Sequence, residues 1–373
     1  MSRVLLTSTS YPSSESDWQG IFIREMLAGL DRAGDTDVSY WGPPGPLPAD
    51  VEYLGSESDR SYLQELADQG GIAHLVRSKP MLGFSRGVGL IRRLRRVLRA
   101  NRRATDVFHL NWLQSALAIP GKGNRALVTV LGTDYKLLEI PGVSTLLRNR
   151  LSGNRVVLAP NAEWMVSKLA GAFDRQVSEV AYVPLGIDQR FYDVNSQPDP
   201  GVRRWITVLR LTRAKVGPLL DWTERLAAEG EEFHLFGPMQ EEITLPAWIH
   251  YHGAVTPDTL IRDWYPQATA MVTLSQHDEG RPQVLLEAMA AGLPIIASRL
   301  PAHQDLLDSA DGGILVDSED AFGAAIKNLS NAETRASLAA RARNSIRSAY
   351  GTWDDCAARY RRLYRHLMQD PST

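Results

Sequence analysis

Cysteine is almost absent from this sequence, which has one cysteine, Cys356, in 373 residues. A single cysteine cannot form a disulfide within the chain, and nothing near it resembles a metal-binding motif. Because disulfides belong to oxidising compartments, this composition fits a reducing cytoplasm. We therefore expect a cytoplasmic protein.

Long apolar runs are also missing. No stretch approaches the ~20 apolar residues of a membrane span, and the apolar part of Met1-Ser-Arg-Val-Leu-Leu is too short for a signal peptide. Hydrophobic residues make up 44% and charged residues 23%, as in ordinary soluble proteins. Because single cores stop growing at about 250–300 residues, the length predicts roughly two domains.

Several site motifs are absent. The sequence has no P-loop, no G-x-S-x-G and no G-x-G-x-x-G after its first predicted strand. Asp35-Thr-Asp37 mimics a metal-binding D-x-D, but its place before a strand favours a simple turn. His250 and His252 would share one strand face, yet no third zinc ligand accompanies them. We predict a site without metal.

The net charge of −2 hides an asymmetry. Residues 1–184 hold 22 basic against 18 acidic side chains, and the remainder holds 19 against 25. Most of the basic excess lies in Arg86 to Arg103, with eight arginines, no acid and apolar residues at helical spacing. One interpretation is a surface helix with a solvated arginine face, and another is attraction to anionic lipid headgroups. Nucleic-acid binding is less favoured, because no recognition motif or stacking platform accompanies the arginines.

Short apolar strands alternate with helical stretches in both halves of the chain. This alternation, occurring twice, predicts an α/β protein of two doubly wound domains. A stretch rich in Pro, Gly and Asp at residues 195–201 predicts the junction. We assign 1–190 to the N-terminal domain and 191–352 to the C-terminal domain. The expected strands are 3–6, 38–40, 107–110, 126–130, 156–158, 180–183, 205–208, 233–236, 249–251, 271–274, 294–297 and 314–316.

The segment from Glu279 to Glu287 is the most informative about function. Residues 271–274 read as a strand, 276–281 as a polar loop, and 284–291 as a helix with Pro282 at its first position. The amides of Gln283, Val284 and Leu285 would then be free to bind a phosphate. Carboxylates accept hydrogen bonds from hydroxyls, so two acids flanking a diphosphate fit a nucleotide sugar. Taken alone, both acids could equally be solvated charges beside a helix.

With these residues placed, the chain resembles family 4 of the retaining glycosyltransferases, over nearly its whole length. Five segments carry the resemblance in the family's order: Asp17 to Glu25 around Gly20, Val183 to Phe191, Arg210 to Lys215, His252 to Val255, and Glu279 to Glu287. The resemblance implies the GT-B fold, with two facing Rossmann-like domains, a cleft between them, and a last helix, about 353–373, that returns to the N-terminal domain.

The resemblance also implies the site residues. It gives catalytic roles to Glu279, which contacts the donor sugar, and to Arg210 and Lys215, which hold the diphosphate. Both cations follow the first strand of the second domain, where such folds bind ligands. The donor-binding set is Gly20, Gly280, Arg281, Pro282, Gln283, Val284, Leu285, Glu287 and Val255. The acceptor or sugar pocket is His109, Asn111, Leu131 and Asp134.

One position departs from the family pattern. Thr129-Val-Leu131-Gly-Thr-Asp134 resembles a T-x-H-G-x-D segment, but Leu131 replaces the histidine that can contact the sugar's 6-hydroxyl. We interpret this as an altered sugar pocket that accepts a donor with a modified or missing 6-hydroxyl.

We therefore predict a retaining, metal-independent glycosyltransferase that moves a sugar from a nucleotide diphosphate sugar to a glycan or lipid-linked acceptor. Cell-surface polysaccharide or glycolipid synthesis is the expected context, with no other cofactor, no nucleic acid, and peripheral contact of Arg86–Arg103 with the inner membrane face. The alternatives are a sugar-nucleotide epimerase and an inactive family member that acts as a binding partner. The base, the sugar, the acceptor and the oligomeric state stay open.

Overall fold

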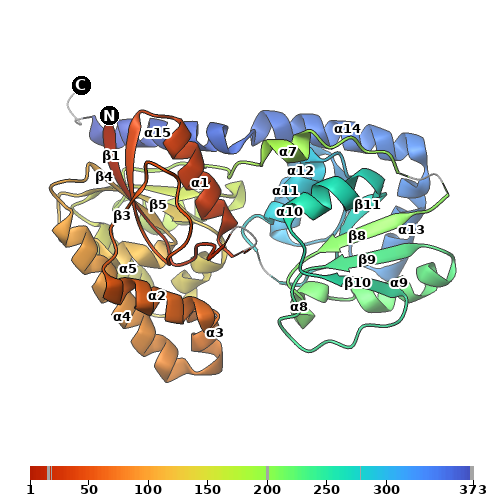
Figure 1. Ribbon diagram of the computed structural model, residues 1–373, viewed down its shortest axis with the longest axis horizontal. Coiled ribbons are helices and arrows are strands. Elements are labelled where there is room, and N and C mark those ends of the chain that lie inside the picture. Colours follow the sequence, from red (N-terminus) through yellow and green to blue (C-terminus); the bar gives the residue numbers. More distant parts are fainter. Residues whose placement is uncertain (15–16, 18, 199–200, 278, 370–373) are drawn as a thin grey trace. The chain divides into compact units, whose positions relative to one another are not determined.

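The chain forms two compact units in the computed structural model, which describes residues 1–14, 17, 19–198, 201–277 and 279–369 (Figure 1). The N-terminal unit comprises Met1–Gly186 and Trp353–Thr373, and the C-terminal unit comprises Ile187–Thr352. Of the predicted linker, residues 199–200 lie outside the described residues, as do residues 370–373 of the predicted last helix.

The N-terminal unit is built on a sheet of seven parallel strands, in the order β3-β2-β1-β4-β5-β6-β7. The strands are short, and all except the edge strands β3 and β7 are largely buried, as expected when helices cover both faces of a parallel sheet. β7 is shorter than the predicted 180–183, although the amides of Ala181 and Val183 still bond to β6 and its end. The strands are β1 (Ser2–Thr7), β2 (Thr36–Trp41), β3 (Glu52–Tyr53), β4 (Val107–Asn111), β5 (Arg125–Val130), β6 (Arg155–Pro160) and β7 (Glu179–Val180).

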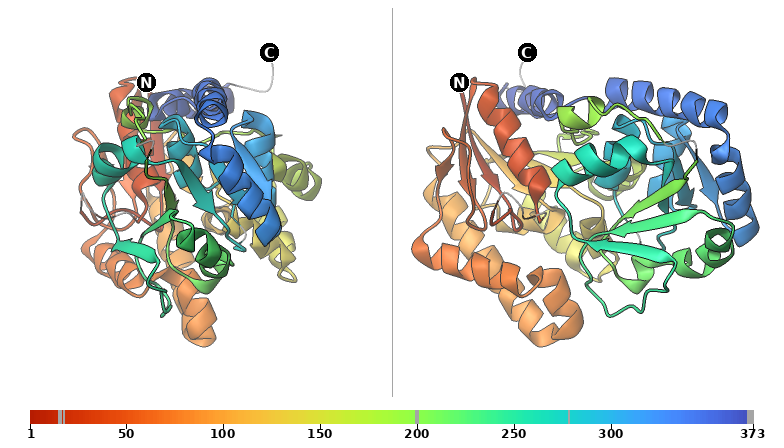
Figure 2. Two further views of the ribbon diagram at one scale, coloured as in Figure 1. Left: turned by 90° about the vertical axis from the view of Figure 1, so that its right-hand side faces the viewer. Right: turned by 45° about the vertical axis from the view of Figure 1, so that its right-hand side comes forward.

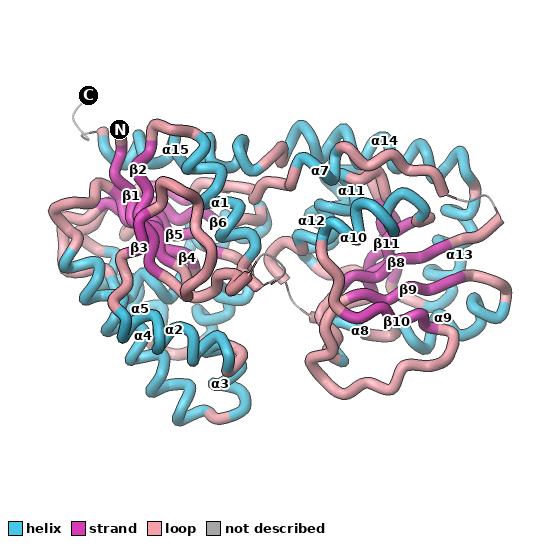
Figure 3. Tube along the Cα trace, in the orientation of Figure 1, coloured by secondary structure: helices cyan, strands magenta, loops and turns pink. Residues whose placement is uncertain are grey.

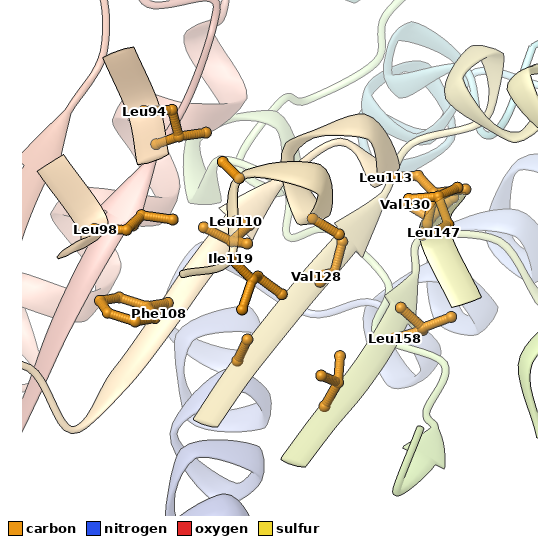
Figure 4. Packing of buried hydrophobic residues seen from close by; sticks show 14 of the residues in the cluster. Leu94, Leu98, Phe108, Leu110, Leu113, Ile119, Val128, Val130, Leu147 and Leu158 are labelled. Atoms are coloured by element: carbon orange, nitrogen blue, oxygen red, sulfur yellow. The ribbon is translucent and has the colours of Figure 1, made fainter. Parts of the chain in front are cut away.

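Helices cover the two faces of this sheet and form two cores. Successive strand residues point to opposite faces, so Phe108 of β4 packs in one core and its neighbour Val107 in the other. Figure 4 shows Leu94 and Leu98 of one covering helix beside Phe108. The helices are α1 (Ile21–Arg32), α2 (Glu57–Asp68), α3 (Gly71–Ser78), α4 (Pro80–Ala100), α5 (Val143–Leu151), α6 (Val166–Phe173) and α15 (Trp353–Met368), with 3-10 turns η1 (Leu113–Ala118), η2 (Thr133–Glu139) and η3 (Glu163–Met165).

The last helix, α15, belongs to the N-terminal unit and packs across α1 (Figure 1). Gly29 of α1 allows this close contact, because a Cβ there would lie 2.8 Å from the Trp353 carbonyl oxygen. Trp353, Tyr360 and Tyr364 are buried in the second core, which is the one that also holds Val107. The unit is therefore assembled from the two ends of the chain.

The C-terminal unit has a sheet of six parallel strands in the order β10-β9-β8-β11-β12-β13 (Figure 3). The order reverses between β8 and β11, and folds of this kind bind ligands beyond the carboxyl ends of the strands at that point. The strands are β8 (Arg204–Val208), β9 (Glu232–Phe236), β10 (Ile249–Gly253), β11 (Ala270–Thr273), β12 (Ile295–Ser298) and β13 (Gly313–Val316).

The helices of the C-terminal unit alternate with its strands. They are α7 (Gln189–Tyr192), α8 (Arg213–Val216), α9 (Leu219–Ala228), α10 (Pro257–Thr259), the π-helical turn η4 (Leu260–Trp264), η5 (Tyr265–Gln267), α11 (Gln283–Ala290), α12 (Pro301–Ala310), α13 (Glu319–Ser330) and α14 (Ala332–Ala349). Across the described part of the chain, no helix combines the length and apolarity needed to cross a membrane.

Candidate active site

Lys215 and Glu279 form an ion pair in the C-terminal unit. Lys215 belongs to α8, which follows β8, and Glu279 lies in the loop after β11. These are the two strands between which the sheet order reverses. The two side chains are only 15% and 17% exposed, so the pair is largely shielded from water.

Gly217 brings α8 against the end of β11. It has φ +54, and a Cβ at this position would lie 2.1 Å from the carbonyl oxygen of Leu274. The same two segments are joined by a hydrogen bond, in which the backbone amide of Gln276 donates to the carbonyl of Ala214 over 2.7 Å. A glycine is therefore required where the Lys215 segment meets the Glu279 loop.

Side chains from β12 and α12 fasten the Glu279 loop. The Ser298 hydroxyl donates to the Ser275 carbonyl over 2.5 Å, and the His277 amide donates to the Ser275 hydroxyl over 3.1 Å. At the other end of the loop, Arg281 forms an ion pair with Asp305. The loop is thus held at both ends, with Glu279 between them.

Arg281 is the most deeply buried cation of this region, with a side chain only 3% exposed. One of its terminal nitrogens bonds to Asp305, and its guanidinium lies 5.5 Å from the Tyr350 ring centre. Its Nε and Nη1 atoms have no hydrogen-bond partner among the described residues. A buried donor without a partner is costly, and an anion is the group that would satisfy two such donors at once.

The start of α11 differs in part from the prediction. Pro282 is the N-cap and not the first helical residue, and no side chain caps this end. The Leu285 amide donates to the Pro282 carbonyl over 3.2 Å. Of the three amides that were predicted to bind a phosphate, this one therefore already has a hydrogen-bond partner. The helix start therefore offers fewer amides than the sequence suggested.

The remaining predicted residues of this unit lie on neighbouring segments. Arg210 is exposed just beyond the carboxyl end of β8, and Gly280 is buried next to Glu279. Glu287 is half-buried on α11, where its charge adds to burial in raising the pKa of Tyr265. Val255 is half-buried after β10 and packs on the core.

His303 is a candidate site residue that the sequence reasoning missed. It is buried at the start of α12, and its Nδ1 donates to the Ser298 carbonyl over 2.8 Å. Burial lowers its pKa, and the nearby charges of Glu279 and Lys215 act on it in opposite directions. With the proton on Nδ1, the Nε2 atom of the neutral ring is an acceptor. Its position after β12, at the ligand-binding edge of the sheet, was the available signal.

In the N-terminal unit, Gly20 is the N-cap of α1 and has φ +74. A Cβ there would lie 2.7 Å from the Tyr11 amide nitrogen and 2.8 Å from the Ser10 carbonyl carbon. The glycine is thus required for the loop after β1 to fold against the start of α1. Its predicted approach to donor phosphates stays a prediction.

The structure places two of the predicted pocket residues in the interior of the N-terminal unit. His109 is fully buried, with Nδ1 2.6 Å from the Tyr364 hydroxyl and Nε2 2.8 Å from the Thr129 hydroxyl. Burial lowers its pKa to about 3, so the ring is neutral. Asn111 is also fully buried and donates to the Thr7 carbonyl over 3.0 Å. Both side chains are part of the interior, because β4 is the covered strand beside β1 in the sheet.

Asp134 shapes the loop that carries Leu131. Its carboxylate accepts from the amides of Leu113, over 2.8 Å, and Leu131, over 3.0 Å. Burial raises its pKa to about 6, although these amides favour the charged form. Leu131 is half-buried and packs on the second core. Asp134 therefore positions the loop, and Leu131 gives it an apolar side chain.

Among the residues that the structure describes, no group of three or more His, Cys, Asp and Glu side chains could hold a metal ion.

Comparisons with known proteins identify a family match and structures with a similar fold. Residues 203–332 match the family model Glycosyl transferases group 1, and no curated protein matched. The fold resembles sucrose-phosphate synthase from Thermosynechococcus elongatus, with 16% identity and a TM-score of 0.72 over 98% of this chain and 99% of that chain. It also resembles a UDP-forming α,α-trehalose-phosphate synthase from Burkholderia xenovorans, with 12% identity and a TM-score of 0.70 over 99% and 100%. An E. coli trehalose-6-phosphate protein bound with UDP-2-fluoro glucose has 12% identity and a TM-score of 0.67 over 99% of each chain.

The predicted fold class is confirmed: the chain is an α/β protein with the GT-B fold. The matched segment includes Lys215, Glu279, Arg281 and His303. The predicted enzyme class, a glycosyltransferase, is confirmed as well, because this segment matches a glycosyltransferase family model.

Proposed function

We propose that the chain is a retaining glycosyltransferase of the family 4 type, which transfers a sugar from a nucleotide diphosphate sugar to an acceptor without a metal ion. The observation that carries the proposal is the shielded Lys215–Glu279 pair at the point where the sheet order reverses. The family match over residues 203–332 supports it, and the structure from E. coli, bound with UDP-2-fluoro glucose, supports a nucleotide sugar as the donor.

The ion pair gives each partner a role when the donor binds. In the free protein the Glu279 carboxylate is the anion next to Lys215. A diphosphate would take its place at Lys215 and offset the charge that develops as the nucleotide leaves. Glu279 would then accept hydrogen bonds from the sugar hydroxyls. The exchange keeps one anion beside the lysine in both states, so no buried charge is left alone.

Neighbouring groups complete the proposed donor site. Arg281 has two buried donors without a partner among the described residues, and a phosphate oxygen at the start of α11 would satisfy them. Arg210 would contact the diphosphate from the end of β8, and Glu287 would accept from the ribose hydroxyls. His303, with its acceptor Nε2, would bind a sugar hydroxyl beside Glu279. Cations and backbone dipoles then supply the stabilisation that a metal supplies elsewhere.

Leu131 sets the proposed sugar preference. Its backbone is held by Asp134, so the loop keeps its shape while an apolar side chain replaces a polar one. We expect faster turnover of a 6-deoxy or pentose donor than of the ordinary hexose, and a clear preference for the hexose would contradict this. Restoring the histidine with Leu131→His should shift the preference back.

For the acceptor, we propose a glycan or lipid-linked sugar at the inner face of a membrane, in the synthesis of a cell-surface polysaccharide or glycolipid. This rests on the excess of basic residues in the N-terminal half of the sequence.

A ligand screen followed by one matched pair of variants tests the proposal. UDP, GDP, ADP and TDP sugars are screened by thermal shift, and the correct one at a hundredfold excess over its Kd should stabilise the fold by about 2.7 kcal/mol. Lys215→Ala should then lower transfer of a radiolabelled sugar by about a hundredfold or more. Arg213→Ala is the control, since it removes an equal charge from the same short helix.

Two outcomes would overturn the proposal. One is near-normal transfer by Lys215→Ala, and the other is failure of every nucleotide sugar to raise the melting temperature. Product analysis separates transfer from epimerisation, because an epimerase releases an altered nucleotide sugar in the absence of any acceptor.

A further inference from the structure

Exposed apolar side chains gather on the hairpin formed by α3 and α4. Nine large hydrophobic residues are exposed in the described part of the chain, and four of them lie within residues 76–84. Met81 is 89% exposed and Phe84 73%, with Val76 and Leu82 less so. Single exposed apolar residues are ordinary, but several together on one element mark an interaction site.

The hairpin holds these side chains on a fixed support. Gly83 of α4 packs on the backbone of α3, where a Cβ would lie 2.5 Å from the Val76 amide nitrogen. At the second turn of α4, the Tyr62 hydroxyl of α2 donates to the Arg86 carbonyl over 2.5 Å. Figure 2 shows α3 and the start of α4 projecting from the N-terminal unit on the side opposite α15. The apolar residues are thus presented outward and not folded back on the core.

The same face of α4 continues as a row of arginines. Met81, Phe84 and Val88 recur at intervals of three and four, and the next members of that row are Arg92, Arg96 and Arg99. These three arginines are exposed and have no ion pair or hydrogen bond among the described residues. The opposite face carries Leu90, Leu94, Val97 and Leu98, which are buried. The outward face is therefore apolar at its start and cationic along the rest.

Other arginines of this region have structural partners. Arg86 forms an ion pair with Glu65, and Arg93 pairs with Asp59 over 3.0 Å while lying above the Tyr62 ring. These contacts fix α4 on α2. Two groups of arginines can therefore be distinguished on α4: those that pair with residues of α2 and those that are exposed on the outward face.

We propose that the outward face of the α3–α4 hairpin docks on an anionic lipid bilayer. Met81 and Phe84 enter the interfacial layer, and Arg92, Arg96 and Arg99 lie against the headgroups, as in helices that lie in the membrane plane. The absence of any acid from Pro80–Ala100 matches the charge of such a surface. A nucleic acid would engage the arginines but offers no apolar layer for Met81. Docking here would bring the protein to the proposed acceptor at the membrane surface, so the biological role of docking rests on the proposed function. The docking itself does not depend on turnover.

Vesicle sedimentation of the full chain tests the docking. Vesicles of phosphatidylcholine with phosphatidylglycerol should bind the protein, and vesicles of phosphatidylcholine alone should bind it far less. Exchanging all three arginines, as Arg92→Gln with Arg96→Gln and Arg99→Gln, should weaken binding about a hundredfold, since each basic residue near the surface contributes roughly fivefold. Met81→Ser with Phe84→Ser should also weaken binding, and more so at high salt, where the charges are screened.

Matched control variants test whether binding depends on this face of the hairpin or only on the total charge and the number of exposed apolar residues. Arg175→Gln, Arg225→Gln and Arg362→Gln change the net charge equally at exposed positions elsewhere and should leave binding unchanged. Ile140→Ser with Leu146→Ser removes exposed apolar residues of the same unit away from the hairpin, and should have little effect. Equal losses for test and control variants would overturn the proposal, as would oligomers that disappear with Met81→Ser and Phe84→Ser while vesicles bind nothing.

A fluorescent label reports insertion directly. Cys356 is buried, so Phe84→Cys introduces the one accessible thiol on the described surface. A polarity-sensitive dye at this position should shift to the blue with anionic vesicles, and the same dye on Leu146→Cys should not. Donor hydrolysis in solution should stay the same in every hairpin variant. An unmodified chain that hydrolyses the donor but does not bind anionic vesicles would overturn the docking alone, and one that binds these vesicles but hydrolyses no nucleotide sugar would overturn only the proposed function.

Discussion

Lys215 and Glu279 neutralise each other in a place where water has limited access. An ion pair of this kind is worth little net free energy, because the desolvation of two charges offsets much of their attraction. The pair matters for donor binding, because the diphosphate can replace Glu279 beside Lys215. The lysine then has an anion next to it both before and after the donor binds. At the scale of single residues, binding and catalysis should therefore respond differently to the two members of the pair.

Glu279→Gln should raise the affinity for the nucleoside diphosphate product while it lowers turnover. The variant removes the carboxylate that competes with phosphate for Lys215, so we expect about five- to tenfold tighter binding. Turnover should fall by about a hundredfold, because the sugar loses a charged acceptor. Calorimetry and single-turnover kinetics measure the two effects, with Glu242→Gln on the nearby exposed segment as the control. Weaker product binding in Glu279→Gln would contradict the exchange of anions.

Gly217→Ala should destabilise the C-terminal unit by about 2–4 kcal/mol. The new Cβ would lie 2.1 Å from the Leu274 carbonyl oxygen, so the segment after α8 and the end of β11 must move apart. Gly230→Ala is the control, since that glycine also has positive φ, +91, but no atom lies within 4 Å of the added carbon. It should cost only about 1 kcal/mol. Urea unfolding compares the two, and equal losses would show that the contact with β11 is unimportant.

At the scale of elements, the edge of the C-terminal sheet carries a stack of rings. His234 of β9 lies between His250 and His252 of β10, with ring centres 4.9 and 5.3 Å away, and the Trp264 ring lies 4.9 Å from it. Its Nδ1 is 3.0 Å from His252 Nε2, and its Nε2 is 3.3 Å from a Glu232 carboxylate oxygen. Two facing imidazole nitrogens can share one proton but not two, so this stack suits neutral rings.

The stack predicts a loss of stability in mild acid. Burial and, to a smaller extent, the charges of the neighbouring histidines lower the pKa of His234 to about 4, while Glu232 opposes them. The unfolded chain, with an ordinary histidine pKa near 6.5, therefore binds protons first as the pH falls. The contribution of neutral His234 is complete above about pH 6.5 and declines towards pH 4, by roughly 1–3 kcal/mol.

Comparing the protein with His234→Asn at pH 7.5 and pH 5 isolates this contribution. His109 and His303 also have lowered pKa values and Asp134 a raised one, but all three are common to both proteins. The urea midpoint of the unmodified chain should fall more between the two pH values than that of the variant. An equal fall in both would mean that His234 does not titrate as described.

The sequence predicted elements well where local pattern and tertiary environment agree, and less well elsewhere. Buried strands such as β4 read as apolar runs because both of their faces are covered. The start of α4 was missed by six residues, since Gly83, Gly87 and Gly89 disfavour helix locally. Packing against α2 and α3 overrides that preference, and at Gly83 and Gly89 the neighbouring chain leaves almost no room for a side chain.

At the site, residue types were predictable and contacts were not. Lys215 and Glu279 follow from motif and strand order, yet Gly217 meets a strand end far along the chain. His109 resembled a ligand contact because it is a polar residue on a strand that ends at the ligand-binding edge of its sheet. Its partner, Tyr364, is 255 residues away and comes from the last helix. Such contacts join segments that are far apart in the sequence. They depend on the tertiary structure, which local sequence patterns do not determine.

For the whole molecule, the two units differ in how the chain builds them, because the end of the chain returns to the N-terminal unit. The C-terminal unit is continuous from Ile187 to Thr352, whereas the N-terminal unit needs α15 from the far end of the sequence. Besides Ala357, five larger residues of α15 are buried in the second core, and large side chains contribute about 1.5–3 kcal/mol each when buried. Together they are of the order of the entire stability of a domain, about 5–15 kcal/mol. These residues are Trp353, Cys356, Tyr360, Tyr364 and Leu367.

Truncation after Thr352 should therefore unfold the N-terminal unit and leave the C-terminal unit folded. Residues 187–352 expressed alone should give a cooperative melting transition and bind the nucleoside diphosphate within about threefold of the full chain, because the side chains proposed to hold the diphosphate, Arg210, Lys215 and Arg281, all come from this segment. The same fragment with Lys215→Ala is the control and should lose that binding. Circular dichroism and calorimetry follow folding and binding. If the fragment melts cooperatively but binds no nucleotide that the full chain binds, groups of the N-terminal unit must contact the diphosphate, and the assignment of the donor site to one unit fails.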